Sequence, residues 1–277
     1  MIRPREIARG IELFPARTPT LPPATHTNSY ALGAGEVLLI EPATPYDDER
    51  REWLQWAAAM KATGRTLVGI LATHHHVDHV SGAGFFARAL DVPVFAHRRT
   101  LDRIADELLD VRAIAIDEGH RFVLGGATER AWTTLHTPGH APGHVVLHDA
   151  ESKTIVAGDM VANGSTIIIP PDDGGDMSDY LAQLRRLDAL GASTMLPAHG
   201  EPIDDPHALL GHYIAHRLAR EAKVYAAHQR LLGELGRAPT ATEMVPLAYD
   251  DTEMALWPLA AVSLEAHLVK LRRDGRI

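Results

Sequence analysis

The feature that most constrains the fold is the stretch THHHVDH at residues 73–79, which places four histidines and one aspartate in seven positions. It directly follows the apolar run LVGIL at residues 67–71, which is typical of a buried strand. On a helix His74 and His76 would point about 200° apart, whereas on an extended segment they face the same side. Chance and a solvated loop are the alternative explanations. The preceding strand favours the extended conformation, in which both histidines can share one ion.

The same stretch provides two different pairs of candidate ligands. Asp78 and His79 come where the chain must turn towards a helix that we expect from residue 82. Two ligands from an extended pair and two from the following turn do not converge easily on one point. They can instead serve two neighbouring ions.

Three later motifs repeat the order of strand, metal-capable residue, and glycine or proline. HTPGHAPGH at residues 136–144 presents His140 in a turn, VAGDM at 156–160 places Asp159 after a strand, and LPAHG at 196–200 does the same for His199. Loops at strand ends commonly build the sites of layered α/β proteins. Because the chain contains no cysteine, a metal site must use His, Asp and Glu side chains.

Five histidines and two aspartates are the candidate ligands, enough for two ions if one carboxylate bridges them. We expect one group of His74, His76 and His140, a second group of Asp78, His79 and His199, and Asp159 as the bridge. Nitrogen and carboxylate donors suit zinc, and also iron or manganese. The expected cofactor is therefore two divalent ions per chain, with Zn²⁺ favoured.

Strand and helix patterns mix through the first two thirds of the chain. Apolar runs predict strands at residues 37–40, 67–71, 92–95, 121–124, 145–148, 154–157 and 194–196. Helical spacing predicts helices at residues 48–62, 82–90 and 178–190, the last with Ser178 as its N-cap. This mixture indicates an α/β fold of packed layers.

The pattern becomes purely helical after about residue 206. Helices are expected at residues 208–235, ended by Gly236 and Pro239, and then at 240–248 and 253–274. The sequence thus predicts a catalytic domain at residues 1–205 and a small all-helical domain at residues 206–277.

Composition limits the location and the partners. A net charge of −9 provides no general attraction to nucleic acid or to an anionic membrane. The first residues do not resemble a signal peptide, and by inspection no stretch reaches the apolar length that spans a bilayer. We therefore expect a cytoplasmic protein without a membrane partner.

Taken in order, THHHVDH, TPGHAPGH, AGD and PAHG resemble the metallo-beta-lactamase superfamily, with its H-x-H-x-D-H signature and downstream His, Asp and His. The resemblance covers about residues 25–205 and implies an αββα sandwich with the metal ions at one edge. The commonest antibiotic-degrading members place a cysteine among their ligands. With Asp159 instead, the chain looks more like the glyoxalase II type of dinuclear hydrolase, which acts on hydroxyacylglutathione.

The C-terminal segment AAVSLEAHLVKLRRDGRI resembles the winged-helix-like segment of the mitochondrial beta-lactamase-like endoribonuclease and its bacterial relatives. The resemblance favours an endoribonuclease as the alternative function, whereas contact within a homodimer or closure of the substrate pocket is the more common role of such a segment. From Glu201 onward there are nine Lys/Arg against eleven Asp/Glu, which is unlike a basic RNA-binding surface.

The favoured function is hydrolysis of a thioester or ester of a small or carrier-bound acyl group. Asp78 is the expected catalytic residue, because its second oxygen can orient the attacking water and accept its proton. One alternative is a metal-dependent endoribonuclease or phosphodiesterase acting on single-stranded RNA, and another is a persulfide dioxygenase with one iron. His75 is expected to face away from the ions, and His144 to hydrogen-bond near them.

Overall fold

The structure is a computed structural model that describes residues 3–127 and 129–277. Its backbone contacts divide the chain into two compact units. Unit 1 comprises Met1–Thr137, Gly143–Ser165 and Ala192–Asp204; unit 2 comprises Pro138–Pro142, Thr166–Gly191 and Asp205–Ile277. The units interleave along the chain, and the expected domain boundary at residue 205 stays a prediction.

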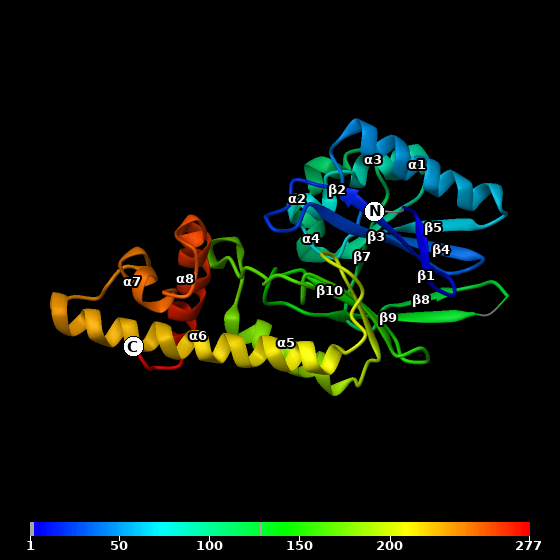
Figure 1. The fold of residues 1–277 in the computed structure, drawn as a ribbon. Helices are drawn as coiled ribbons and strands as arrows, with labels where there is room; N and C mark the ends of the chain where they lie inside the picture. Colours follow the sequence, from blue (N-terminus) through cyan, green and yellow to red (C-terminus); the bar gives the residue numbers. More distant parts are fainter. Residues whose placement is uncertain (1–2, 128) are drawn as a thin grey trace. The chain divides into compact units, whose positions relative to one another are not determined.

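Two mixed β-sheets form the framework of unit 1 (Figure 1). The seven strands of the first sheet follow one another in chain order: β1 (Arg5–Ala8), β2 (Ile11–Arg17), β3 (His26–Leu32), β4 (Glu36–Ile40), β5 (Thr66–Leu71), β6 (Val94–His97) and β7 (Ala113–Ile116). The second sheet has the order β12 (Thr194–Pro197), β11 (Thr154–Gly158), β10 (Val145–Asp149), β9 (Arg130–His136) and β8 (Arg121–Leu124). Strands β4 to β7 are parallel, as are β11 and β12.

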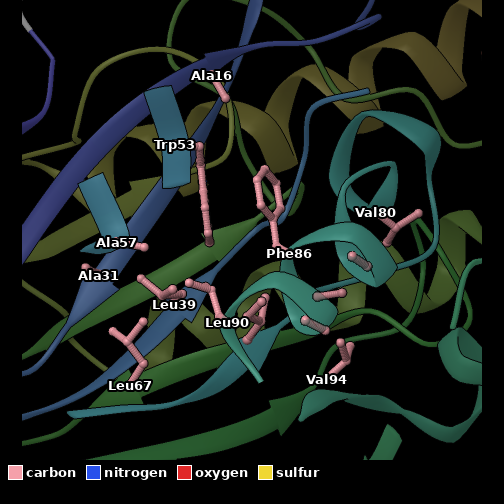
Figure 2. Close-up of a cluster of buried hydrophobic side chains, with 14 of the residues drawn as sticks. Ala16, Ala31, Leu39, Trp53, Ala57, Leu67, Val80, Phe86, Leu90 and Val94 are labelled. Atoms are coloured by element: carbon pink, nitrogen blue, oxygen red, sulfur yellow. The ribbon is translucent and has the colours of Figure 1, made fainter. Parts of the chain in front are cut away.

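Helices cover the outer face of the first sheet. Unit 1 contains α1 (Asp47–Ala62), α2 (Val77–Val80), α3 (Ala83–Leu90), α4 (Arg98–Arg103) and the 3₁₀ turn η1 (Ala105–Leu108). In Figure 2, Trp53 of α1 and Phe86 of α3 lie together in the core, with their rings stacked at a centroid distance of 4.0 Å. A second apolar layer fills the space between the sheets and includes Leu38, Trp132 and Val145. These layers confirm the predicted α/β class.

The strand β2 has no counterpart in the sequence predictions, because Pro15 interrupts its apolar residues. Proline lacks the N–H that a central strand needs, and it is tolerated where one side of a strand is unpaired. Strand β1 pairs with β2 only along residues 11–13, so Pro15 lies beyond that ladder and pairs across only to Asn28 of β3. The local pairing pattern therefore permits a strand that the sequence alone argues against.

The loops that carry most of the expected ligands leave the strands at one edge of unit 1. Parallel strands have their C-terminal ends at the same edge, so the residues after β4 and β5 are neighbours. Two backbone hydrogen bonds join the sheets there, from Asn28 N to Ala198 O at 2.8 Å and from Val145 N to Thr73 O at 2.9 Å. Asp78 and His79 lie in the short helix α2, where a turn was expected.

Unit 2 is built from helices in the part of the chain that the structure describes. These are η2 (Pro171–Asp173), α5 (Met177–Ala189), α6 (Pro206–Leu235), α7 (Ala241–Ala248), η3 (Met254–Leu256) and α8 (Trp257–Arg273). The prediction of Ser178 as the N-cap of α5 is wrong: the cap is Asp176, whose carboxylate accepts hydrogen bonds from the Ser178 and Asp179 N–H groups. The predicted end of α6 at Gly236 is confirmed, with φ at +68°.

The expectation that no stretch could span a bilayer is wrong for the helical segment Met254–Arg273. Judged by length and composition only, this segment could cross a membrane. Within unit 2 the apolar face of α8, including Leu264, Leu268 and Leu271, packs with α6 and α7. A helix that contributes to a core reaches this hydropathy without any bilayer.

Candidate metal centre

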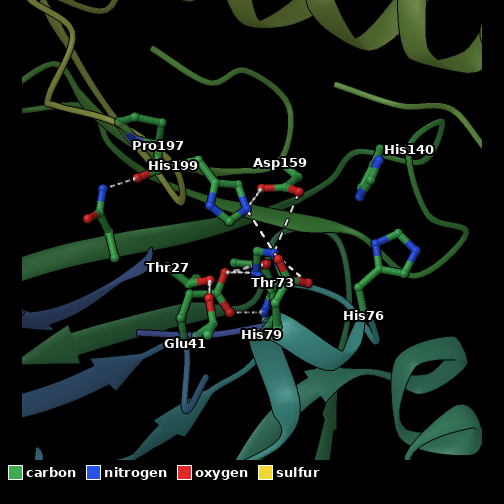
Figure 3. Close-up of polar contacts among 12 residues, drawn as sticks. Thr27, Glu41, Thr73, His76, His79, His140, Asp159, Pro197 and His199 are labelled. Atoms are coloured by element: carbon green, nitrogen blue, oxygen red, sulfur yellow. Dashed lines mark hydrogen bonds and ion pairs between the residues drawn. The ribbon is translucent and has the colours of Figure 1, made fainter. Parts of the chain in front are cut away.

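Four of the expected ligands lie together in unit 1, and Figure 3 shows three of them, His79, Asp159 and His199, pointing towards one another. The Nε2 atom of His79 is 3.7 Å from a carboxylate oxygen of Asp78 and 3.5 Å from one of Asp159. The Nε2 atom of His199 is 3.5 Å and 3.4 Å from the other oxygens of the same two aspartates. Two imidazoles and two carboxylates thus surround one small space.

These separations are long for hydrogen bonds and suited to a shared cation. Two donor atoms that each lie ~2.1 Å from one tetrahedral ion are about 3.4 Å apart. In addition, both ring nitrogens of His79 are buried without a hydrogen bond of normal geometry within the described residues, and Nε2 is the one that faces the two aspartates. A buried nitrogen of this kind is destabilising unless another partner is supplied, so the residues present fit a metal ion.

The electrostatics of the cluster also favour a bound cation. Burial lowers the pKa of His79, but the surrounding carboxylates, with Asp159 the strongest, outweigh burial and hold that pKa well above its usual range. Burial raises the pKa of Asp159, but His199 and His79 outweigh it and hold that pKa well below the usual range. The buried carboxylates therefore stabilise positive charge at the imidazoles, and a divalent ion would meet the same demand.

His74 and His76 lie on the same side of the chain, as predicted for an extended conformation of residues 74–76. Their facing nitrogens, His74 Nε2 and His76 Nδ1, are 2.9 Å apart. The other nitrogen of His74, Nδ1, is 3.0 Å from Thr73 Oγ1. Because Thr73 Oγ1 donates to the carboxylate of Glu41, it accepts from His74, which leaves the His74 Nε2 lone pair facing His76.

Glu41 is a buried carboxylate beside the cluster that the sequence did not single out. It directly follows β4, is 1% exposed, and has a φ of +58°, a conformation that is uncommon for residues other than glycine. Its carboxylate lies 3.2 Å from Nδ1 of His79, on the opposite side of the ring from Asp159 (Figure 3). A carboxylate behind an imidazole fixes the tautomer that presents Nε2 to a metal. The sequence shows only that VLLIE ends a strand with a polar residue, which does not by itself indicate a role beside a histidine.

Replacing Glu41 with glutamine is expected to weaken binding of the ion held by His79 about 10–100-fold, because the amide orients His79 less strongly. Titration of the metal-free variant with Zn²⁺ checks this. Glu151→Gln, which alters an exposed carboxylate elsewhere in unit 1, provides the control. An unchanged affinity in Glu41→Gln would contradict the orienting role.

His144 supports the aspartate and is not arranged as a ligand, in agreement with the sequence analysis. Its Nε2 atom accepts the backbone N–H of Asp159 at 3.0 Å, and its Nδ1 atom is 2.8 Å from Thr137 Oγ1. Gly158 allows this approach, since a Cβ at that position would lie 2.6 Å from His144 Nε2. His144 therefore holds the backbone that presents Asp159.

His199, in the loop after β12, is held through its other nitrogen by the first residue of β3. Nδ1 of His199 donates to the backbone oxygen of His26 at 3.0 Å, which leaves Nε2 to face the two aspartates. The preceding Pro197 is fixed as well, because its carbonyl oxygen accepts from Tyr30 Oη at 2.7 Å and from Asn28 Nδ2 at 2.9 Å. The position of His199 thus depends on β3.

The remaining expected ligand, His140, belongs to unit 2. Its Nδ1 atom is 2.7 Å from the backbone oxygen of Ile168. Its ligand role stays a prediction. His75, which was expected to face away from the ions, lies with Nε2 3.0 Å from an Arg103 guanidinium nitrogen.

Comparison with protein families gives two matches along the chain. Residues 22–199 match the model described as "Metallo-beta-lactamase superfamily". Residues 240–277 match the "Beta-lactamase associated winged helix domain".

Individual proteins show the same likeness. The chain is 29% identical to the Beta-lactamase-like protein 2 homolog of Drosophila melanogaster over 258 residues, 91% of this chain and 84% of that protein. It is 30% identical to an Atrochrysone carboxyl ACP thioesterase of Aspergillus fumigatus over 227 residues, 79% of this chain and 67% of that protein. A solved metallo-beta-lactamase family protein from Thermus thermophilus has 25% identity and a TM-score of 0.73, covering 98% of this chain and 95% of that one.

Proposed function

The chain belongs to the metallo-beta-lactamase superfamily and carries its associated winged helix domain, and from this membership we propose a dinuclear hydrolase of thioesters or esters. As a member it is a metal-dependent hydrolase. The observation that carries the proposal is the convergence of Asp78, His79 and His199, whose ligand atoms lie within 4.8 Å of one another. Asp159 faces both histidines of that group.

In the proposed site, Asp78, His79 and His199 would hold one ion, and Asp159 would be shared with a second. His74 and His76 would hold the second ion, and His140 is assigned to it from the sequence motif. We favour zinc, because its usual donors in proteins include the imidazole nitrogens and carboxylate oxygens found here. Bound divalent ions lower the pKa of water and polarise a carbonyl oxygen.

The chain's own residues then position the reactants. The side chain of Asp78 is 14% exposed, whereas that of His79 is fully buried, so Asp78 is the more accessible to an incoming substrate. Its carboxylate can orient a water for attack on the acyl carbon and accept the proton that the water releases. Glu41 keeps His79 in place and His144 keeps Asp159 in place while negative charge develops on the substrate.

Two observations favour an acyl substrate over RNA. One relative with 30% identity is named as an acyl-carrier-protein thioesterase. The segment from Glu201 onward has nine Lys/Arg against eleven Asp/Glu, so it offers little attraction to phosphates.

A substrate panel tests the proposal with one metal-loaded preparation. An acyl thioester, a lactone, a phosphodiester and a short single-stranded RNA are compared by kcat/KM, with an Asp159→Ala preparation as the control for contaminating activity. We expect the thioester to exceed the phosphodiester and the RNA by at least about 100-fold, a difference of ~2.7 kcal/mol in transition-state stabilisation. Cleavage of RNA without thioester turnover would instead support the endoribonuclease.

A further inference from the structure

A cavity of about 430 Å³ lies in unit 1 beside the candidate metal centre. Its walls come from the β2–β3 loop, the loop after β11 and the loop after β12. His199 belongs both to the cavity wall and to the metal cluster, so the cavity adjoins the reacting position. Its size is within the range of about 300–1,000 Å³ that is typical of small-ligand sites.

The cavity wall contributes no lysine or arginine to bind an anionic ligand within the described residues. Glu201 is the one acidic side chain among the described residues that line the cavity. Glu201 is already paired with Arg5. Away from His199 and its proposed metal ion, a phosphate or carboxylate placed here would lose its hydration without gaining a lysine or arginine partner, which is strongly unfavourable.

The polar amides of the lining are also engaged by the protein itself. Nδ2 of Asn28 donates to the carbonyl oxygens of Pro197 at 2.9 Å and Gly200 at 2.7 Å. Nδ2 of Asn163 donates to the carbonyl oxygen of Glu201 at 3.1 Å. The amide donors therefore hold the loops in place, and Pro15, Pro23 and Ala24 provide an apolar wall for a ligand.

We infer that this cavity binds the uncharged, mainly apolar acyl chain of the substrate, an inference that rests on the proposed thioesterase function. The carbonyl group lies at the metal centre, and the chain extends past His199 towards the β2–β3 loop. The thiol part of common acyl carriers bears phosphates or carboxylates, so it lies outside this cavity. Ala24, half-buried in the wall, limits the length of the chain that fits.

A series of straight-chain acyl thioesters on one small thiol, from acetyl to decanoyl, tests the inference. For the wild-type protein, kcat/KM should rise about fourfold for each methylene that enters the cavity and then level off. Ala24→Trp fills the wall, so it should reduce turnover of the long thioesters at least about tenfold and leave the acetyl thioester within about twofold. Ala58→Trp, on the exposed side of α1, is the matched control and should change neither.

Ala24→Asp provides a second variant that does not depend on fitting an indole into the loop. It should show the same selective loss for long chains, because it places a charge beside them. The inference is overturned if chain length has no effect in the wild-type protein, if both Ala24 variants depress all lengths equally, or if a succinyl thioester is preferred to butyryl. If no thioester is hydrolysed by the metal-loaded protein, the proposed function itself fails, and the acyl role of the cavity fails with it.

Discussion

Replacing Asp159 with alanine is expected to lower turnover by at least about 100-fold and to remove at least one equivalent of bound metal. Asp159 faces the Nε2 atoms of both His79 and His199, at 3.5 Å and 3.4 Å. Removing its carboxylate takes away a proposed bridge and leaves two buried imidazoles with less negative charge around them. Elemental analysis of the purified variant and initial rates on the preferred thioester check both parts.

Asp102→Ala is the control for this substitution. The Asp102 side chain is 64% exposed on α4, and its ion pair with Arg98, at 4.0 Å, is a weak surface pair. It should retain the wild-type metal content and rate. A thermal melt of each variant separates loss of the site from loss of the fold. An Asp159→Ala protein that kept both metal equivalents and full turnover would contradict the bridging role.

Removal of the metal is expected to abolish turnover, with recovery on addition of Zn²⁺. The metal-free protein should also unfold at a lower temperature, because an ion present at 1,000 times its dissociation constant stabilises the folded state by about 4 kcal/mol. Without the ion, the negative charge of Asp159 is balanced only through the imidazoles of His79 and His199 among the ligands that the structure describes. Chelation, dialysis and stepwise addition of Zn²⁺, followed by rate and thermal melt at each step, measure both effects.

The stoichiometry of recovery distinguishes the proposed centre from its alternatives. Two equivalents per chain are expected for full rate, and far-UV circular dichroism should show that the metal-free protein keeps its secondary structure. Full turnover by the metal-free protein would exclude a metal-dependent reaction. One iron per chain, with oxygen consumption on a persulfide substrate, would support the dioxygenase instead.

The extent to which the sequence predicts the site depends on how local each feature is. His74 and His76 were identified because a strand followed by alternating histidines is a pattern within a few residues, and they do lie 2.9 Å apart. The end of α6 at Gly236 is equally local, because glycine adopts the left-handed conformation without strain. The cap of α5 was misplaced by two residues, since Asp176 and Ser178 are both good capping residues.

Features that depend on distant partners were not predicted. Strand β2 was missed because its proline is acceptable only where the β1 ladder has already ended. Glu41 was missed because its role comes from His79, which lies beyond the next helix and strand in the chain. No pattern near Glu41 distinguishes a carboxylate that orients a histidine from one that simply ends a strand.

The sequence by itself therefore determined which side chains can bind a metal and that each follows a strand, because hydrophobic periodicity and ligand chemistry are local properties. Only the tertiary structure decided which of them meet. Parallel pairing places the ends of β4 and β5 at one edge, and hydrogen bonds between the two sheets bring the loop of His199 to that edge. Asp159 and His79 each shift the pKa of the other because both are buried. That burial arises only when those loops pack against one another.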